Sequence, residues 1–543
     1  MYGTRIAALA GVALALGSGT VPGGHQGTEM ASRRSTPSER LIDSLLRRMT
    51  LEEKLGQLNL VSVESNRVSD EQRELVRRGL VGGFLNLTGA EATRAIQDVA
   101  VRRSRLGIPL LFGLDVIHGY RTIFPIPLAE ASAFDPDLAE AAARAAAREA
   151  SAAGVNWTFA PMVDIARAPR WGRIAEGAGE DPYLGSALAA ARVRGFQGRA
   201  LSDSDAVMAT AKHYAAYGAA EGGRDYNTVD VSERTLREVY LPPFRAAVRA
   251  GVGTIMSSFN EIAGIPSSAN RWLLTDVLRH EWGFKGFVVS DWGSIEELQQ
   301  HGIAASRAQA GRAALEAGVD MDMMGGVYVQ DLADFVRRHQ LPIGVVDEAV
   351  RRVLREKIAL GLFADPYRGA AARREQDAIP TPATRALARR AAVESIVLLK
   401  NDSAMLPLSP SVHTLAVIGP LADDSADVLG PWHALGRSGE AVTALAGIKA
   451  RVSTATTVLF ARGCDVTGSD TTGFAEAVAA ARRADVAVLV LGEADSMSGE
   501  AASRSTLDLP GEQERLLEAV AATGTPVVAV LMSGRPLAVP WAA

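Results

Sequence analysis

Asp291 stands at a position where a carboxylate can do chemistry. It lies in the run Gly-Phe-Val-Val-Ser-Asp-Trp-Gly of residues 286–293, in which an indole follows the acid directly. A short, continuous apolar run predicts a buried strand, so the carboxylate is expected at the strand's carboxyl end. In parallel α/β folds the strand-to-helix loops meet at that end and bind ligands. A helix N-cap or a structural carboxylate is the alternative interpretation of Asp291.

Other polar residues occupy equivalent positions earlier in the chain. Each of the following side chains follows or ends an apolar run: Asp115, Asp164, Lys212, His213 and Asn260. A single buried polar residue at such a position is usually a hydrogen-bonded structural group. Several charged groups at the ends of different strands instead favour one shared site on a common rim.

A second carboxyl group lies on a loop of small residues. The segment Ser-Met-Ser-Gly-Glu-Ala-Ala-Ser-Arg of residues 496–504 carries Glu500 and follows an apolar run at 486–491. Such a loop can reach across a domain interface, although a solvated glutamate is the simpler interpretation. Sugar hydrolysis uses this combination, because one carboxylate attacks the anomeric carbon while a second carboxyl serves as acid and base.

The elements that position these residues alternate between apolar and amphipathic runs. Strands are predicted within residues 81–87, 108–115, 155–161, 207–213, 253–260 and 286–291. Helices are predicted at 38–49, 138–153 and 232–250, and residues 50–53 have the pattern of a capping box. This alternation predicts a TIM-like (β/α)8 barrel, with a doubly wound sheet as the alternative.

A second α/β unit is predicted after the barrel. We place the barrel at residues 39–365, an interdomain linker rich in Pro, Ala and charge at 366–385, and the second unit at 386–543. A helix at 384–395 opens this unit, and strands are expected at 415–419, 486–492 and 526–532. Because the sequence ends soon after a strand, we expect this α/β sandwich to be C-terminally truncated, with apolar surface left uncovered.

Composition excludes several classes of function. The 543 residues exceed what one core usually supports. The 57 basic and 62 acidic residues give a net charge of -5 and no basic stripe, which disfavours nucleic acid as a partner. The single cysteine, Cys464, permits neither an internal disulfide nor a cysteine-based zinc cage.

The N-terminus has the three parts of an export signal. Arg5 supplies positive charge, residues 6–16 are apolar and residues 17–20 are small. We therefore predict a signal peptide at residues 1–20 and a flexible linker at 21–38, with the mature protein periplasmic or secreted. The apolar part is too short for a membrane span, and no other stretch is long and apolar enough for one.

Eight short motifs follow one another along the chain. They are Gly-Leu-Asp-Val-Ile-His-Gly (113–119), Pro-Arg-Trp-Gly-Arg (169–173), Glu-Gly-Ala-Gly-Glu-Asp-Pro-Tyr (176–183), Lys-His-Tyr (212–214), Gly-Arg-Asp-Tyr-Asn-Thr-Val-Asp (223–230), Met-Ser-Ser-Phe-Asn (256–260), Val-Ser-Asp-Trp (289–292) and Ser-Gly-Glu (498–500). Their order resembles glycoside hydrolase family 3, most closely its bacterial periplasmic β-glucosidases, and the likeness extends from about Leu41 to the end of the sequence. Each motif is weak by itself, and their order makes the resemblance specific.

The resemblance implies a retaining hydrolase with Asp291 as nucleophile and Glu500 as acid/base. Side chains implied to bind or line the pocket for the terminal sugar are Asp115, Arg173, Lys212, His213, Met256, Phe259 and Trp292. We expect the cations Arg173 and Lys212 to keep Asp291 ionised, and Glu500 to need a raised pKa. No metal and no cofactor are implied.

Two departures from the family pattern concern the pocket. Ala168 replaces an acid that the family usually carries, so we expect whatever that acid supports near Arg173 to be held more loosely here. Phe259 occupies a place often held by Tyr, which removes a hydroxyl group able to bond the nucleophile.

The leading hypothesis is an exo-acting β-glucosidase that releases terminal glucose from β-linked gluco-oligosaccharides or aryl glucosides. A β-xylosidase or arabinosidase on the same scaffold is the close alternative, because one hydroxymethyl group distinguishes the sugars. A truncated, non-catalytic sugar-binding protein and a phosphorylase are further alternatives. The β-N-acetylglucosaminidase branch of the family is disfavoured, because residues 212–218 read Lys-His-Tyr-Ala-Ala-Tyr-Gly where that branch has Lys-His-Phe-Pro-Gly-His-Gly.

Overall fold

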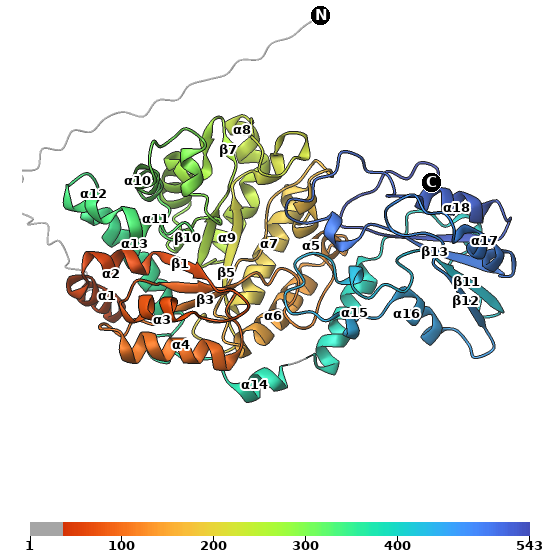
Figure 1. The fold of residues 1–543 in the computed structure, drawn as a ribbon, viewed down its shortest axis with the longest axis horizontal. Coiled ribbons are helices and arrows are strands. Elements are labelled where there is room, and N and C mark those ends of the chain that lie inside the picture. Colours follow the sequence, from red (N-terminus) through yellow and green to blue (C-terminus); the bar gives the residue numbers. More distant parts are fainter. Residues whose placement is uncertain (1–35, 379) are drawn as a thin grey trace, which may run out of the picture.

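The computed structural model describes residues 36–378 and 380–543, which form two units side by side along the long axis (Figure 1). The predicted signal peptide and most of the predicted linker at 21–38 lie outside the described residues. Helix α1 (Pro37–Arg48) already begins within the last two linker positions. The predicted capping box is present at α2 (Leu51–Gln57), where the Thr50 hydroxyl accepts from the Glu53 amide and the Glu53 carboxylate accepts from the Thr50 amide.

The first unit is built on an eight-stranded parallel sheet that closes almost completely into a barrel. Its strands, in spatial order, are β10 (Asp322–Met323), β1 (Asn59–Ser62), β2 (Gly83–Leu85), β3 (Leu111–Leu114), β4 (Trp157–Thr158), β5 (Met208–Tyr214), β6 (Thr254–Ser257) and β9 (Phe287–Val289). A parallel bridge between Val289 and Met321 brings the two edges together. The predicted barrel is confirmed, and the doubly wound alternative for this unit is wrong.

Two barrel strands and one helix differ from the prediction. Strand β1 follows directly on α2 and β10 has only two residues, so neither forms an apolar run that stands out in the sequence. The helix predicted at 232–250 is broken into α8 (Glu233–Thr235), a π-helical turn (Leu236–Tyr240) and α9 (Pro242–Arg249). Pro242 and Pro243 cause the break, because proline lacks the amide that continues a helix.

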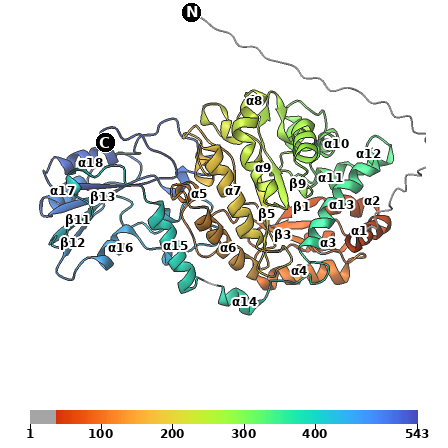
Figure 2. The ribbon, with the colours of Figure 1, turned by 180° about the vertical axis from the view of Figure 1, so that it is seen from behind.

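Helices surround the barrel on its outer face (Figures 1 and 2). The remaining helices of this unit are α3 (Asp70–Arg77), α4 (Ala90–Arg103), α5 (Pro127–Ala131), α6 (Pro136–Ala152), α7 (Pro182–Gln197), α10 (Arg307–Ala317), α11 (Val327–Asp331), α12 (Ala333–Arg337) and α13 (Ile343–Ala359), with a π-helical segment at Trp272–Glu281 and a small hairpin of β7 (Glu261–Ile262) and β8 (Ile265–Pro266). No helix of the described residues is long and apolar enough to cross a membrane.

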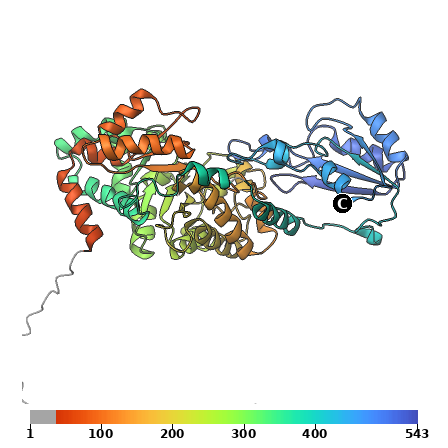
Figure 3. The same ribbon diagram turned by 90° about the horizontal axis from the view of Figure 1, so that it is seen from below.

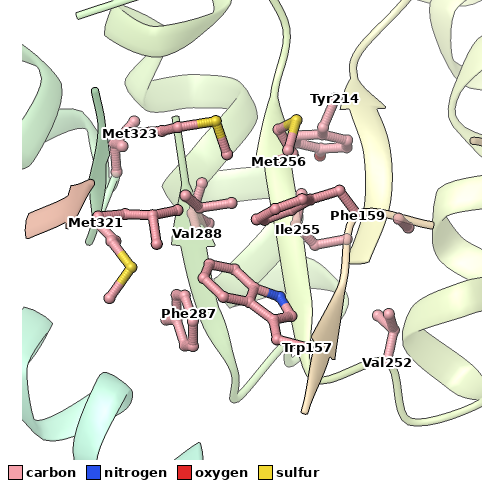
Figure 4. Packing of buried hydrophobic residues seen from close by; sticks show 14 of the residues in the cluster. Trp157, Phe159, Tyr214, Val252, Ile255, Met256, Phe287, Val288, Met321 and Met323 are labelled. Carbon is pink, nitrogen blue, oxygen red and sulfur yellow. The ribbon is translucent and has the colours of Figure 1, made fainter. Parts of the chain in front are cut away.

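The barrel interior is filled by large side chains (Figure 4). The Trp157 ring packs edge-on against Phe159 and Phe287, with ring centroids 4.7 and 5.2 Å apart. Its indole N–H is satisfied by the hydroxyl groups of Thr210 and Thr254, at 2.8 and 2.9 Å. A closed, hydrogen-bonded core of this kind leaves the strand ends as the place for a site.

The second unit is a four-stranded parallel sheet with helices on both faces. Its strands, in spatial order, are β12 (Thr457–Ala461), β11 (Thr414–Ile418), β13 (Val486–Gly492) and β14 (Val527–Met532). Helices α17 (Phe474–Arg482) and α18 (Gln513–Ala521) cover one face, and α16 (Ala444–Arg451) packs on the other. The three predicted strands are present; β12 was not predicted, because it is a half-exposed edge strand with a short apolar run.

The chain between the units is folded onto the barrel. Helix α14 (Ala372–Asp377) lies within the predicted linker, and its Glu375 carboxylate accepts from the Ala90 amide at the start of α4, at 2.9 Å. Helix α15 (Pro382–Ser395), which the sequence assigns to the second unit, packs through Ala391 against Leu138 of α6. Figure 3 shows α15 lying between the two units.

Apolar side chains remain exposed on the second unit. The segment Ile-Val-Leu-Leu at residues 396–399 is between 57% and 79% exposed, and the edge strand β14 is only partly covered. The prediction that this unit is truncated stays a prediction.

Candidate active site

Side chains from the carboxyl ends of three barrel strands meet on one rim, as their positions in the sequence predict. Asp115 follows β3, Lys212 and His213 lie near the end of β5, and Asp291 follows β9. The Lys212 ammonium donates to Asp115 Oδ1 at 2.5 Å. His213 Nε2 lies 3.7 Å from Asp291 Oδ2. The rim therefore holds acids and bases in direct contact.

Asp291 is held with one carboxylate oxygen free. Its Oδ1 accepts from the Trp292 amide at 2.8 Å, whereas Oδ2 is buried with no hydrogen-bond partner among the described residues. Burial raises the pKa of Asp291 from its usual 3.8 to about 7, although Arg173 and Lys212 lower it. The expectation that these two cations keep Asp291 ionised thus omitted the larger effect, because the depth of burial is not visible in the sequence.

Asp164 fixes the orientation and the tautomer of His213. Asp164 Oδ2 accepts from both the backbone amide and Nδ1 of His213, each at 2.9 Å. Burial, with Arg173 and Lys212 nearby, holds the pKa of His213 well below its usual value, so the imidazole is neutral. With the proton on Nδ1, the Nε2 lone pair faces Asp291 and can accept a hydrogen bond from a substrate hydroxyl group.

Arg173 connects the two units. Its Nε and Nη2 donate to the two oxygens of Glu176 at 2.9 and 3.0 Å, while Nη1 lies 3.4 Å from Glu500 Oε1. The side chain is 2% exposed. Although residue 168 is alanine, Arg173 itself is firmly held, because the bidentate bond to Glu176 fixes the guanidinium plane.

Glu500 reaches the barrel from the topological switch point of the second sheet. The chain leaves β11 toward one edge of the sheet and β13 toward the other, and loops at such a divergence form a binding crevice. The loop after β13 carries Glu500 and is anchored where the Gly499 amide donates to the Gly172 carbonyl at 2.8 Å. The loop after β11 carries Trp432, whose indole N–H donates to Glu176 at 3.0 Å.

Glu493 and Arg535 fasten the Glu500 loop to the barrel. Glu493, at the end of β13, pairs with Arg535 at 3.1 Å and with Arg504 at 2.5 Å. The Arg535 guanidinium also donates to the carbonyl groups of Pro169, Arg170, Met497 and Ala502. One buried side chain thereby joins the second sheet, the Glu500 loop and the barrel loop that carries Arg173.

The three apolar residues predicted for the pocket lie in different environments. Met256 is 2% exposed and packs beside Tyr214 in the barrel core (Figure 4). Phe259 is partly buried and its ring lies 5.3 Å from that of Tyr226. Trp292 is 48% exposed and is free to contact a ligand.

Three residues near the acids were not singled out from the sequence. Glu176 and Tyr226 lie within two of the quoted motifs, while Trp432 lies outside all of them. Trp432 places its ring 5.7 Å from the Lys212 ammonium, and the Tyr226 hydroxyl donates to Glu500 Oε1 at 2.7 Å. The order of the motifs does not predict the contacts of Trp432 and Tyr226 across the boundary between the units, because these contacts form only when the two units meet.

Comparison with known proteins identifies both units. The glycosyl hydrolase family 3 N terminal domain matches residues 50–356, and the glycosyl hydrolase family 3 C-terminal domain matches residues 396–543. The chain belongs to glycosyl hydrolase family 3. The resemblance drawn from the eight motifs is thus confirmed.

Members of family 3 with different names are similar to this chain. A periplasmic beta-glucosidase of Salmonella typhimurium is 44% identical over 93% of this chain and 69% of its own length. A beta-xylosidase of Formosa agariphila is 39% identical over 82% of this chain and 65% of its own length.

Solved structures of family 3 share the fold. The beta-glucosidase of Listeria innocua has a TM-score of 0.87 at 40% identity, over 92% of this chain and 70% of that one. The same enzyme has been solved with glucose, and a mutant of it has been solved with laminaribiose.

Proposed function

We propose that this family 3 glycoside hydrolase is a retaining, exo-acting β-glucosidase that removes terminal non-reducing β-D-glucosyl residues. The observation that carries the proposal is the pairing of two acids in unlike environments. Asp291 is buried on the barrel rim, whereas Glu500, 28% exposed, approaches from the second unit. Two carboxyl groups with different surroundings can take different roles in one reaction.

In the first step Asp291 Oδ2, the oxygen without a hydrogen-bond partner among residues 36–378 and 380–543, attacks the anomeric carbon. Glu500 gives its proton to the leaving oxygen, and a covalent glycosyl-enzyme results. In the second step the Glu500 carboxylate takes a proton from water, which displaces Asp291. Inversion at each step leaves the configuration of the sugar unchanged.

The remaining rim residues suit the recognition of sugar hydroxyl groups. Lys212 and Arg173 donate, Asp115 accepts, and the His213 Nε2 lone pair accepts. Lys212 and Arg173 also lower the pKa of Asp291 and so favour its attacking form. The exposed ring of Trp292 offers an apolar face to a pyranose.

The names of the relatives support glucose as the sugar, through the Salmonella and Listeria enzymes and the glucose complex. The Formosa beta-xylosidase supports a β-xylosidase as the second candidate. A periplasmic or secreted location is supported by the signal-like N-terminus and by the name of the Salmonella relative.

Hydrolysis of nitrophenyl β-glucoside and nitrophenyl β-xyloside by the 543-residue chain compares the two candidates. A higher kcat/KM on the xyloside would replace the glucosidase proposal by the xylosidase one. A 2-fluoro-glucoside should label Asp291, and NMR should detect β-glucose as the first product. Labelling of another residue, or α-glucose as first product, would refute the two-step mechanism.

A further inference from the structure

Tyr226 is a residue of the barrel unit whose hydroxyl group contacts the proposed acid/base directly. Its hydroxyl group donates to Glu500 Oε1 at 2.7 Å, across the boundary between the units. The second donor near this oxygen is Arg173 Nη1, at 3.4 Å. Both neighbours offer protons, and a hydrogen bond donated to a carboxyl group is stronger when that group is ionised.

The conformation of Tyr226 is imposed by its surroundings. Its φ angle of 60° lies in the left-handed region, which non-glycine residues adopt only where other contacts hold them. Its ring stands edge-on to Phe259, with centroids 5.3 Å apart and planes at 84°. It also lies 6.3 Å from the ring of Tyr217. These aromatic contacts aim the hydroxyl group at the Glu500 loop.

Asp225 fastens the same loop on the other side of Glu500. One of its oxygens accepts from the Trp171 indole at 2.8 Å, and the other accepts from the Ala501 amide at 2.7 Å. The Asp225 amide donates to the Ser503 hydroxyl group at 3.0 Å. Glu500 is therefore held through its carboxyl group by Tyr226 and through its following peptide by Asp225.

We propose that Tyr226 is a positioning residue for Glu500: its hydroxyl group orients the carboxyl group and stabilises the carboxylate that serves as base in the second step. This inference rests on the proposed function. The hydroxyl group can also accept a hydrogen bond from the protonated acid, so the orientation persists in the first step. The charged and titratable groups that face Glu500 are Arg173, Asp225, Tyr226 and, across the pocket, Asp291.

Tyr226→Phe tests this role, because it removes the hydroxyl group and keeps the ring that packs on Phe259. Without the donor, the carboxylate form of Glu500 loses a hydrogen bond and is less favoured. The alkaline limb of the kcat/KM profile therefore moves upward by about half a unit to one unit. This displacement of the alkaline limb is small for the loss of a hydrogen bond to a charged group, because the Tyr226 side chain is 48% exposed to solvent.

Two matched variants make the result unambiguous. Tyr183→Phe makes the same chemical change at an 86% exposed side chain and should leave the profile unmoved. Glu500→Gln should remove the alkaline limb on an activated aryl glucoside, which assigns that limb to Glu500. Thermal melting of Tyr226→Phe should match that of the unaltered protein, because the aromatic contacts remain.

The outcomes separate the two proposals. If Glu500→Gln removes the limb while Tyr226→Phe leaves it in place, Tyr226 has no such role and the proposed function stands. If the limb persists in Glu500→Gln, the acid/base assignment fails, and the role of Tyr226 fails with it. An upward shift in Tyr226→Phe alone, with Tyr183→Phe unchanged, supports the inference.

Discussion

Replacing Asp291 by Asn should stabilise the folded protein at alkaline pH while it abolishes turnover. The folded-state pKa of Asp291 is raised from 3.8 to about 7, so the folded protein binds this proton more tightly than the unfolded chain does. The free energy of unfolding therefore falls as the pH rises from 3.8 to about 7. Above pH 7 the whole destabilisation by the buried carboxylate is present. A shift of about three units corresponds to roughly 4 kcal/mol in the free energy of unfolding.

The stabilisation by Asp291→Asn should grow with pH, because it arises from ionisation of the buried carboxyl group of Asp291. At pH 8, where the buried Asp291 is ionised, its presence lowers the free energy of unfolding by roughly 4 kcal/mol. At pH 5 the buried group is protonated, and the free energy of unfolding is lowered by about 2 kcal/mol. For a unit of roughly 300 residues the unfolding entropy converts these values into melting temperatures about 6 °C and about 3 °C higher for Asp291→Asn. The other buried carboxyl groups with raised pKa values are common to both proteins, so their contributions cancel.

Thermal melts followed by circular dichroism at pH 5 and pH 8, supported by urea titrations, measure this difference. Asn preserves the shape of the side chain, and its carbonyl group can still accept from the Trp292 amide. Equal melting temperatures at pH 8, or a difference that does not grow with pH, would show that Arg173 and Lys212 fully offset the burial of the carboxylate. The reasoning about burial would then be wrong.

Two further changes test the surroundings of the acids. Lys212→Met removes a cation that lowers the pKa of Asp291, so the acidic limb of the kcat/KM profile should move to higher pH; an unmoved limb would contradict the electrostatic role of Lys212. Gly172→Ala places a Cβ atom 2.3 Å from the Gly499 carbonyl oxygen, which must displace the loop of Glu500. Turnover should fall at least about tenfold in Gly172→Ala. Labelling of Asp291 by a 2-fluoro-dinitrophenyl glucoside should persist, because this reagent needs little acid assistance. Loss of both turnover and labelling would indicate misfolding.

The sequence predicts the framework of the barrel rim because strand ends are marked locally. The apolar run before Asp291 and the polar residues at the ends of β3 and β5 suffice to place these groups on one rim. Short or half-exposed strands such as β1, β10 and β12 carry too few apolar residues for this signal.

Contacts between the units could not be predicted from local patterns. Trp432 and Tyr226 reach the acids only because two surfaces meet, and neither residue has a spacing that reveals its partner. The same holds for the pKa of Asp291, which depends on how deeply the folded chain buries it. Helix α15, which the sequence assigns to the second unit, packs on α6, because its apolar face does not specify which unit it covers.

The guanidinium group of Arg535 has a consequence for the order of assembly during synthesis. Domains fold from the N-terminus as the chain emerges, and all barrel strands and helices lie before Leu360. The residues that fasten Glu500 to the barrel, Glu493 and Arg535, are made much later. A nascent chain thus contains the strand of Asp291 long before Glu500 can reach the barrel rim, and by the proposed mechanism hydrolysis begins only once both units have docked.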